Sequence, residues 1–426
     1  MERGGSNYVV RIAVVIVLIA LVTTAAVGWG SEIRPKNDAV VGGEFLHPEG
    51  AIPVTIVVGS GQDREEEDRE PRRVTIAGTG DVLIHGGIIR RAAHNAAGGH
   101  REYDFRPMFS EVRPIFDAVD LSICHLEVPI SSDNTGLAGF PLFNAPRELA
   151  DGLAWAGFDA CSTASNHIMD QKMEGVISTH DQLDRAGVAH AGGNRTAEEA
   201  EMPRIYEAGD VLVGHVSATF SPGQFARPHP WVTDLLSDDR FEERARVARE
   251  AGADIVVVSL HWGYEYHVDP TPHQQELGRR LLEEGIADLI LGHHAHVVQP
   301  ITFVEGRALV YGLGNFISNQ SAACCAPGAQ DGMIAVIEMV EDGEGGWESE
   351  VFVIPTWVDR RDYTVVEVGR ALRDPEWSRW RTQLEVSHRR TVETVGDEVV
   401  IIDGDDMDRF QTDEKRDPSE LLLVER

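Results

Sequence analysis

Side chains that bind metals follow the apolar runs of this sequence repeatedly. Carboxylate, amide and imidazole groups end five such runs, which are VTIAGTGD, VDLSICHLE, FDACSTASNH, DIVVVSLH and DLILGHHAH. Mixed nitrogen and oxygen donors of this kind bind divalent transition metals, and a pair of such ions activates water for hydrolysis. The sequence therefore predicts a metal-dependent hydrolytic site. The residues concerned are Asp81, Glu127, Asn166, His167, His261, His293, His294 and His296.

Each of these residues also has an ordinary structural explanation. Asp81 suits the cap of a following helix, and Glu127 suits a charge at the rim of the fold. A lone histidine such as His261 is more often a core side chain whose hydrogen bonds are satisfied. Only the repetition at successive strand ends favours the metal site.

The histidine cluster and the Asn-His pair suggest how roles are divided. Residues i and i+2 of an extended backbone face the same side, so we expect His294 and His296 to converge while His293 points away. The amide oxygen of Asn166 is expected to bind metal. The imidazole of His167, left uncoordinated, then protonates a leaving group.

The runs that carry these residues alternate with segments of helix length between residues 74 and 316. This alternation predicts βαβ units, an α/β fold and a mainly parallel sheet, with ligands at the carboxyl ends of its strands. The segment 333–358 predicts a hairpin around Asp342-Gly343, so the sheet should finish antiparallel. The helix-length segments, each ending on a glycine that stops the helix, are 147–157, 175–187, 240–252 and 274–285.

The N-terminus has the pattern of an export segment. Residues 12–29 are uncharged and mostly apolar, and they follow Arg3 and Arg11. We expect an uncleaved membrane anchor with a cytoplasmic N-terminus, because arginines before a span keep that side inside. A cleaved signal peptide and a buried core helix are the alternatives. The predicted parts are a membrane anchor or signal segment (1–30), an acidic linker (31–71), a main domain (72–360), a C-terminal helical and strand extension (361–404) and an acidic tail (405–426).

Charge and cysteine usage narrow the function further. The chain has 38 Lys and Arg against 70 Asp and Glu, a formal net charge of −32, which argues against a nucleic-acid partner. Its four cysteines have no CxxC spacing, so a tetrathiolate zinc site is unsupported. An exported chain allows one or two disulfides, but their connectivity does not follow from the spacing. The cysteines are Cys124, Cys161, Cys324 and Cys325.

From Val74 to Val358 the chain resembles the CapA capsule-synthesis family of poly-γ-glutamate production. The motifs that carry the resemblance are GTGDVLIHGG, DLSICHLEVPIS, GFDACSTASNHIMD, HWGYEY, PTPHQQ, GHHAHVVQP and YGLGNFIS. The resemblance implies a metallophosphoesterase-like (calcineurin-like) α/β/β/α sandwich of two mixed sheets flanked by helices, preceded by an N-terminal transmembrane helix.

The resemblance also implies roles for individual residues. It places one or two divalent ions, Mn, Fe or Zn, at a shared centre, with His167 as the acid. The metal ligands implied are Asp81, Glu127, Asn166, His261, His294 and His296. The substrate contacts considered are His85, Glu265 and Asn315.

Four positions depart from the family pattern. His125 stands where the family has Asn, Lys172 where it has Gly, and Ala295 where it has Pro. Leu83 occupies the position of a metal-binding His in true metallophosphoesterases, although His85 is close enough to substitute. These departures remove no proposed ligand, and with Leu83 in place of a histidine the resemblance implies at least one metal ion and at most two.

The function implied is a role in the biosynthesis or export of poly-γ-glutamate or a related capsular polymer. The protein would be single-pass in the cell membrane with its domain facing outward, or secreted if cleaved, beside other capsule synthase subunits. A hydrolase would cleave a phosphoester or a γ-glutamyl amide. The alternatives are a non-catalytic subunit that binds polymer and a purely structural surface domain. A polymer groove would need cations, which the pairs Arg90-Arg91, Arg279-Arg280 and Arg360-Arg361 could supply.

Overall fold

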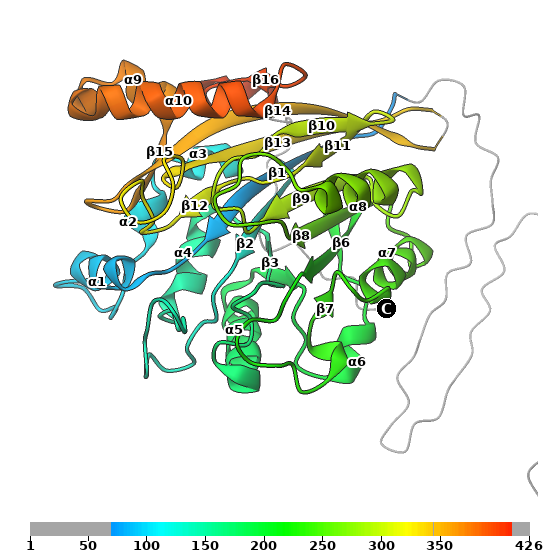
Figure 1. Ribbon diagram of the computed structural model, residues 1–426, viewed down its shortest axis with the longest axis horizontal. Coiled ribbons are helices and arrows are strands. Elements are labelled where there is room, and N and C mark those ends of the chain that lie inside the picture. The colour runs from blue at the N-terminus through cyan, green and yellow to red at the C-terminus, as the bar shows by residue number, and fades with distance from the viewer. Residues whose placement is uncertain (1–69, 344, 411–426) are drawn as a thin grey trace, which may run out of the picture. The chain divides into compact units, whose positions relative to one another are not determined.

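Two β-sheets packed face to face form the centre of the computed structural model of this chain (Figure 1). The structure describes residues 70–343 and 345–410. The first sheet consists of β1 (Arg73–Val82), β2 (Leu121–Leu126), β3 (Ala160–Ser162), β4 (Ala189–Ala191), β12 (Asn315–Ile317), β13 (Asp331–Glu341), β14 (Trp347–Asp359), β15 (Thr364–Glu367) and β16 (Val400–Ile401). The second consists of β5 (Ile205–Ala208), β6 (Val211–Thr219), β7 (Asp234–Leu235), β8 (Ile255–His261), β9 (Leu289–His293), β10 (Ile301–Val304) and β11 (Arg307–Val310).

Both sheets are mixed. The first runs in the order β15-β14-β13-β1-β2-β3-β4, with β12 on β1 and β16 on β14. The second runs β10-β11-β9-β8-β6-β5, with β7 on β6. In the first sheet β1 to β4 are parallel up to the edge, and β13, β14 and β15 form an antiparallel half. In the second sheet parallel pairs occupy the middle, and β5 and β10 pair antiparallel at the two edges. The predicted hairpin is confirmed, because β13 and β14 pair antiparallel along eleven positions from Asp331 to Glu341.

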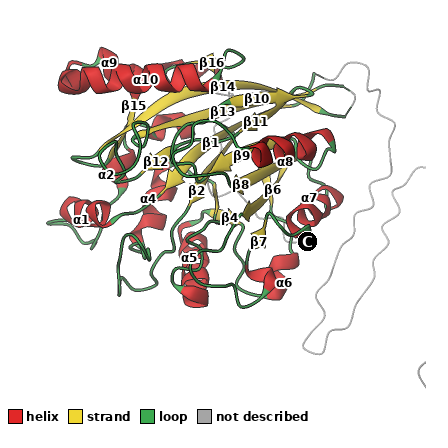
Figure 2. Cartoon of the chain, in the orientation of Figure 1, coloured by secondary structure: helices red, strands yellow, loops and turns green. Residues whose placement is uncertain are grey.

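Helices cover the outer faces of the sheets (Figure 2). The four predicted helices are confirmed as α4, α5, α7 and α8, and glycines 157 and 187 end the first two in the left-handed conformation. The helices are α1 (Gly86–Asn95), α2 (Arg106–Phe109), α3 (Arg113–Phe116), α4 (Glu148–Ala156), α5 (Lys172–Ala186), α6 (Ala197–Glu201), α7 (Arg240–Glu250), α8 (Pro272–Glu283), α9 (Val368–Arg373) and α10 (Arg381–Val395). The 3₁₀ turns are η2 (Pro230–Val232), η3 (Pro375–Trp380) and η4 (Gly404–Phe410).

Three apolar layers hold the sandwich together. The layer between the sheets contains Ile123, Val257 and Ile337, all fully buried or nearly so. A second layer joins the first sheet to α2 and α4, and a third joins the second sheet to α7 and α8. Strands covered on both faces are apolar along their whole length, which explains why β1 is buried from Val74 to Val82. The result is the α/β/β/α arrangement that we predicted.

The C-terminal segment continues the first sheet. β15 and β16 both pair with β14, and α9 and α10 pack against the same strand. Residues 404–410 form η4, in which Met407 and Phe410 are buried, whereas we predicted a loose acidic tail from 405 onward. Two apolar side chains in an acidic sequence are enough to hold this turn against the core. Residues 411–426 lie outside the described part.

The predicted anchor and almost all of the predicted linker also lie outside the described residues. In the part of the chain that is described, every helix is too short or too polar to cross a membrane. Two disulfides are present, one joining Cys124 of β2 to Cys161 of β3 and one joining the neighbours Cys324 and Cys325.

Candidate metal centre

The polar side chains predicted to bind metal meet where strands of both sheets end. Asp81 of β1 is the register partner of His125 of β2 in the first sheet. His261 of β8 is the register partner of His293 of β9 in the second sheet. These strands are parallel within each sheet, so their carboxyl ends lie at the same edge. The centre is therefore shared between the two sheets.

Two glycines allow the backbone to pass close to its neighbours immediately before site residues. A β-carbon at Gly80 would lie 2.1 Å from the carbonyl oxygen of Gly314, and one at Gly292 would lie 1.9 Å from that of Tyr311. Any larger residue would displace the strand at these two points. The residue after each of these glycines carries a ligand side chain, so the close approach fixes where that side chain points.

Six side chains form two groups that could each hold a metal ion. In both groups the candidate ligand atoms lie within 4.8 Å of one another, and all six residues are buried. The first group is Asp81, His125 and His293, and the second group is Glu127, His294 and His296.

One imidazole connects the two groups. His296 Nδ1 donates a hydrogen bond of 2.8 Å to Asp81 Oδ2, and His296 Nε2 lies 3.7 Å from Glu127 Oε1. Donation from Nδ1 leaves Nε2 unprotonated in the neutral ring. That nitrogen faces the second group. Burial opposes a charge on the ring, but Glu127 and Asp81 outweigh it and raise the pKa of His296 to about 9, so a cation that binds at Nε2 must displace a proton.

Several ligand atoms of the centre are buried without a hydrogen-bond partner in residues 70–410. Both carboxylate oxygens of Glu127, both ring nitrogens of His293 and Nδ1 of His294 are in this condition. Buried polar atoms almost always have partners, because burial without one costs roughly 1–3 kcal/mol each. A concentration of such atoms at one point is explained if the Glu127 carboxylate and one nitrogen of each imidazole donate lone pairs to a cation. The donor set therefore fits divalent metal.

Charges within the centre shift the pKa values of its groups. Burial raises the pKa of Glu127 to about 8. Burial would also raise the pKa of Asp81, but the adjacent imidazoles of His293 and His296 outweigh it and lower that pKa. Burial and the charge of His296 lower the pKa of His294 to about 3, so His294 is a neutral imidazole near pH 7. Asp81 as carboxylate and His294 as neutral imidazole are the forms that coordinate metals.

Two of the predicted ligands lie beside the groups and bind each other. His261 Nε2 and Asn166 Oδ1 are 3.2 Å apart, and His261 Nδ1 is 2.9 Å from His125 Nε2. The chain continues from His125 Nδ1 to the hydroxyl of Ser162 at 2.8 Å. The ring of His261 also lies 4.6 Å from that of His294. The structure thus brings every predicted metal ligand to one place.

The expectation that His293 points away is wrong, because its side chain belongs to the first group. β9 ends at His293, and φ is +86° at His294 and +54° at His296. The alternation of an extended strand therefore does not extend past His293. Sequence reasoning also left out His125, although it stands two residues before Glu127 and replaces an amide with an imidazole.

His167 is held by a carboxylate next to the centre. Its Nδ1 lies 2.7 Å from Oδ2 of Asp170, which also accepts the backbone N–H of Phe143 at 2.8 Å. Burial opposes the charge on His167, but Asp170 and the charge of Glu127 outweigh it and raise its pKa. A raised pKa keeps a proton available for a leaving group at neutral pH.

The three predicted substrate contacts occupy different positions. His85 precedes α1, and its ring packs edge-on against Phe143 at 5.2 Å. Glu265 is exposed in the loop after β8, and its charge acts on the pKa of Glu127. Asn315 is buried and donates to the carbonyl oxygen of His296 at 3.3 Å, so it supports the backbone of a ligand.

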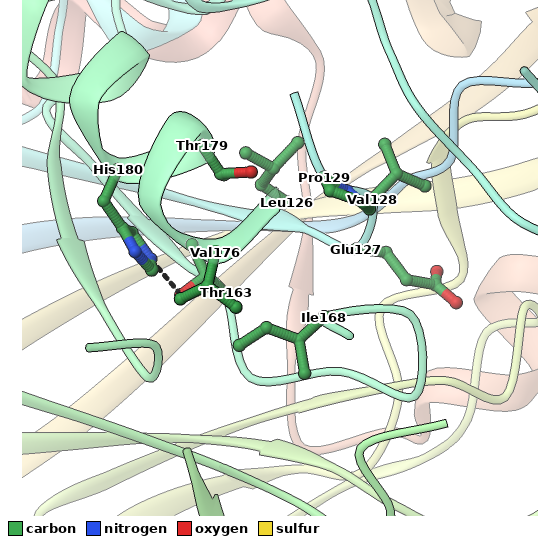
Figure 3. A pocket seen from close by; sticks show the side chains of 9 residues that line it. All are labelled: Leu126, Glu127, Val128, Pro129, Thr163, Ile168, Val176, Thr179 and His180. Carbon is green, nitrogen blue, oxygen red and sulfur yellow. Dashed lines mark hydrogen bonds between the residues drawn. The ribbon is translucent and has the colours of Figure 1, made fainter. Parts of the chain in front are cut away.

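A small cavity lies behind Glu127, with room for about one water molecule in 10 Å³ (Figure 3). His180 and Thr163, which bond each other at 3.1 Å, line its far side. Figure 3 shows the carboxylate of Glu127 directed away from them.

The fold and the centre define an α/β sandwich with buried candidate ligands for metal between its two sheets. Residues 75–320 match the family described as "Bacterial capsule synthesis protein PGA_cap". The match covers more than half of the chain, and the chain belongs to this family.

Two curated relatives and one solved structure illustrate the likeness. The chain is 30% identical over 217 residues to "PGA biosynthesis protein CapA" of Bacillus subtilis, covering 50% of this chain and 57% of that protein. It is 26% identical over 261 residues to "Capsule biosynthesis protein CapA" of Bacillus anthracis, covering 59% and 61%. The calcineurin-like phosphoesterase YfkN from Bacillus subtilis matches 76% of this chain and 98% of that one, with 12% identity and a TM-score of 0.42. A structural likeness of that size says nothing about activity.

Proposed function

We propose that this protein is a metal-dependent hydrolase that takes part in making or exporting poly-γ-glutamate or a related capsular polymer. Family membership supports the capsule role. The observation that supports hydrolysis is the set of buried ligand atoms of Glu127, His293 and His294, for which the described residues offer no hydrogen-bond partner.

The side chains of the centre divide the work of hydrolysis. Divalent ions, Mn, Fe or Zn, would supply an activated water and polarise the bond under attack when bound there. Asp81, His125 and His293 would hold one ion, and Glu127, His294 and His296 a second. His167, oriented by Asp170, gives its proton to the departing group.

The bond that is cleaved is a γ-glutamyl amide or a phosphoester. The name of the Bacillus subtilis relative favours the amide, since poly-γ-glutamate is linked by such bonds. One of the three arginine pairs considered for a polymer groove, Arg279-Arg280, does not favour long-polymer binding. Arg279 pairs with Glu283 at 3.2 Å, and Arg280 pairs with Glu242 at 2.6 Å, so both are neutralised on the surface of α8.

We further propose that residues 12–29 anchor the protein in the cell membrane with the sandwich facing outward. Their apolar run and the arginines before it support this placement. Other capsule synthase subunits are proposed partners at the same membrane. An outward position brings the centre to polymer that is being exported.

Metal analysis of the full chain, purified without chelator, tests the hydrolase proposal. We expect one to two equivalents of metal in the wild type by mass spectrometry and almost none in the His294→Ala variant. Metal-loaded protein should then hydrolyse γ-glutamyl peptides or aryl phosphates. A folded wild type that takes up no Mn, Fe or Zn would instead favour a non-catalytic role in polymer handling.

A further inference from the structure

The turn between β14 and β15 lies against the start of α1, beside the metal centre. Asp362 in this turn pairs with Arg91 of α1 at 3.2 Å. The hydroxyl of Tyr363 lies so close to Gly87 that a β-carbon there would be 2.1 Å away. This turn follows the family-matched residues in sequence, yet it contacts the helix that starts five residues after Asp81.

Two arginines at this contact have no acidic partner among the residues that the structure describes. They are Arg360, in the turn, and Arg90, in the first turns of α1. Their neighbours differ, since Arg361 pairs with Asp359 at 2.7 Å and Arg91 pairs with Asp362. In a chain of net charge −32, cations without an acidic partner give this contact a locally positive charge.

The side chain of Arg360 is held in place without being neutralised. Its Nη2 donates to Oδ1 of Asn319 at 3.1 Å, and the hydroxyl of Tyr363 donates to the same oxygen at 2.7 Å. Nε of Arg360 is buried and has no hydrogen-bond partner in the described part of the chain. A guanidinium that is held in place and keeps its full charge is suited to binding a carboxylate or phosphate.

The backbone at this point adds to the positive charge. α1 has ten residues, no acid in its first turn, and no described side chain that caps its first amides. Nη1 of Arg90 folds back toward Gly86, 3.5 Å from where a β-carbon on that glycine would be. Helix N-termini attract anions through their free N–H groups. Tyr363 is held at φ +56°, a costly conformation for an aromatic residue, which is common at binding sites.

This positive region adjoins the centre through His85 and Phe143. His85 precedes α1, and its ring packs on Phe143, which in turn packs on His167 at 4.7 Å. Burial lowers the pKa of His85 to about 4, and the charges of His296, His167 and Arg360 act in the same direction. The arginine and the proposed acid are thus both near one imidazole.

We propose that Arg360, Arg90 and the N-terminus of α1 form an oxyanion-binding subsite that holds an anionic group of the substrate beside the bond to be cleaved. The group is the α-carboxylate of a γ-linked glutamyl unit or a phosphate. The proposal rests on the proposed hydrolase and names its substrate class. The two nearest acids of the turn, Asp359 and Asp362, do not oppose this binding because Arg361 and Arg91 neutralise them.

Calorimetric binding of γ-glutamyl-glutamate and of inorganic phosphate to the metal-loaded full chain tests the subsite. Arg360→Gln and Arg90→Gln should each weaken binding of the preferred anion by about tenfold, the effect of losing one charge-assisted hydrogen bond. Arg279→Gln is the control and should change binding less than about twofold, since Arg279 lies on the surface of α8 in an exposed ion pair with Glu283. The anion that binds more tightly identifies the source of the oxyanion.

Kinetics separate this subsite from the proposed hydrolysis. If substrate is turned over, Arg360→Gln should raise KM for the anionic substrate while kcat stays nearly constant, and Arg360→Lys should recover part of the loss. Arginine-dependent binding without turnover of any substrate would retain the subsite and reject the hydrolase. Equal binding in wild type and Arg360→Gln, or no binding of either anion by wild type, would overturn the subsite.

Discussion

His296 and Asp81, which are 215 residues apart in the chain, are joined by a 2.8 Å hydrogen bond at the boundary between the two candidate metal groups. Asp81 lies in β1 of the first sheet. His296 lies three residues after His293, where β9 of the second sheet ends. The bond fixes the tautomer of the imidazole, and a carboxylate that does this also makes the other nitrogen a better ligand. The two groups are therefore coupled through a single ring.

Replacement of His296 tests that coupling. His296→Ala should reduce bound metal from one or two equivalents to a small remaining fraction. The substitution removes both a ligand and the hydrogen-bond partner of Asp81. The fold should survive. His190→Ala is a matched control, since His190 is buried and bonded to Asp184 at 3.0 Å but lies outside both groups. Unchanged metal in His296→Ala, measured by mass spectrometry, would contradict the assignment.

His125 distinguishes one metal from two. His125→Asn restores the residue that the family pattern has at this position and removes an imidazole from the first group. We expect the loss of about one equivalent, since second-group ligands remain and site affinity depends on ligand count. His215→Asn, another buried histidine with a hydrogen bond to Ser259 at 3.0 Å, serves as control. Two equivalents retained in His125→Asn would exclude this residue as a ligand.

His167 should affect turnover and not metal content. His167→Ala is expected to keep wild-type metal and lower kcat by about 10²- to 10⁴-fold, the range for a general acid. Asp170→Asn should lower kcat less, because it disturbs the orientation and raised pKa of the imidazole without removing it. Steady-state rates on a substrate with a poor leaving group provide the measurement. Undiminished turnover in His167→Ala would remove it as the acid.

The raised pKa of Glu367, which is not a metal ligand, predicts that the free energy of unfolding depends on pH. Burial raises its pKa to about 7 from an ordinary 4.5, although the carboxylate caps α9 by accepting the N–H of Arg370. The folded state therefore binds more protons than the unfolded state between pH 4.5 and 7. Protonated Glu367 therefore adds up to about 3 kcal/mol to the free energy of unfolding. This stabilisation is fully present below pH 4.5 and is lost as the pH rises through 7.

Urea denaturation at pH 5 and pH 8 measures this effect. Glu367→Gln should gain free energy of unfolding relative to wild type at the higher pH, because its side chain stays neutral throughout. Glu385→Gln, on the exposed face of α10, should follow wild type at both. A constant difference between Glu367→Gln and wild type would show that the carboxyl does not titrate in this range.

Local sequence pattern predicts most of the elements but not all of their neighbours. The strands and helices follow from apolar periodicity and glycine stops, and the β13–β14 hairpin follows from Asp342-Gly343. Nothing local indicates that β13 lies beside β1, some 260 residues earlier in the chain. That pairing depends on how the whole apolar surface is buried between two sheets. The same is true of the turn at Arg360, which reaches α1 only through the order of strands.

Residue type and position predicted which residues gather at the centre, whereas backbone conformation decided their grouping. Asp81, Glu127, Asn166 and His261 all stand at or shortly after strand ends, as alternation suggests. The roles of His293 and His125 were missed for different reasons. The first depends on positive φ angles after β9, which alternation does not reveal. His125 was visible in the sequence as a histidine in place of the asparagine of the family pattern, but it was not considered as a metal ligand.

The boundaries of the recognisable family sequence do not coincide with those of the folding unit. The match ends at residue 320, yet β13 and β14 begin later and form the centre of the first sheet beside β1. A chain cut at 320 would leave β1 with an open edge, and by removing Ile337 and Val353 it would expose the remaining apolar side chains of the layer between the sheets. Such a fragment would be prone to associate with copies of itself. The minimal unit for expression or domain exchange must therefore extend through β16 and η4.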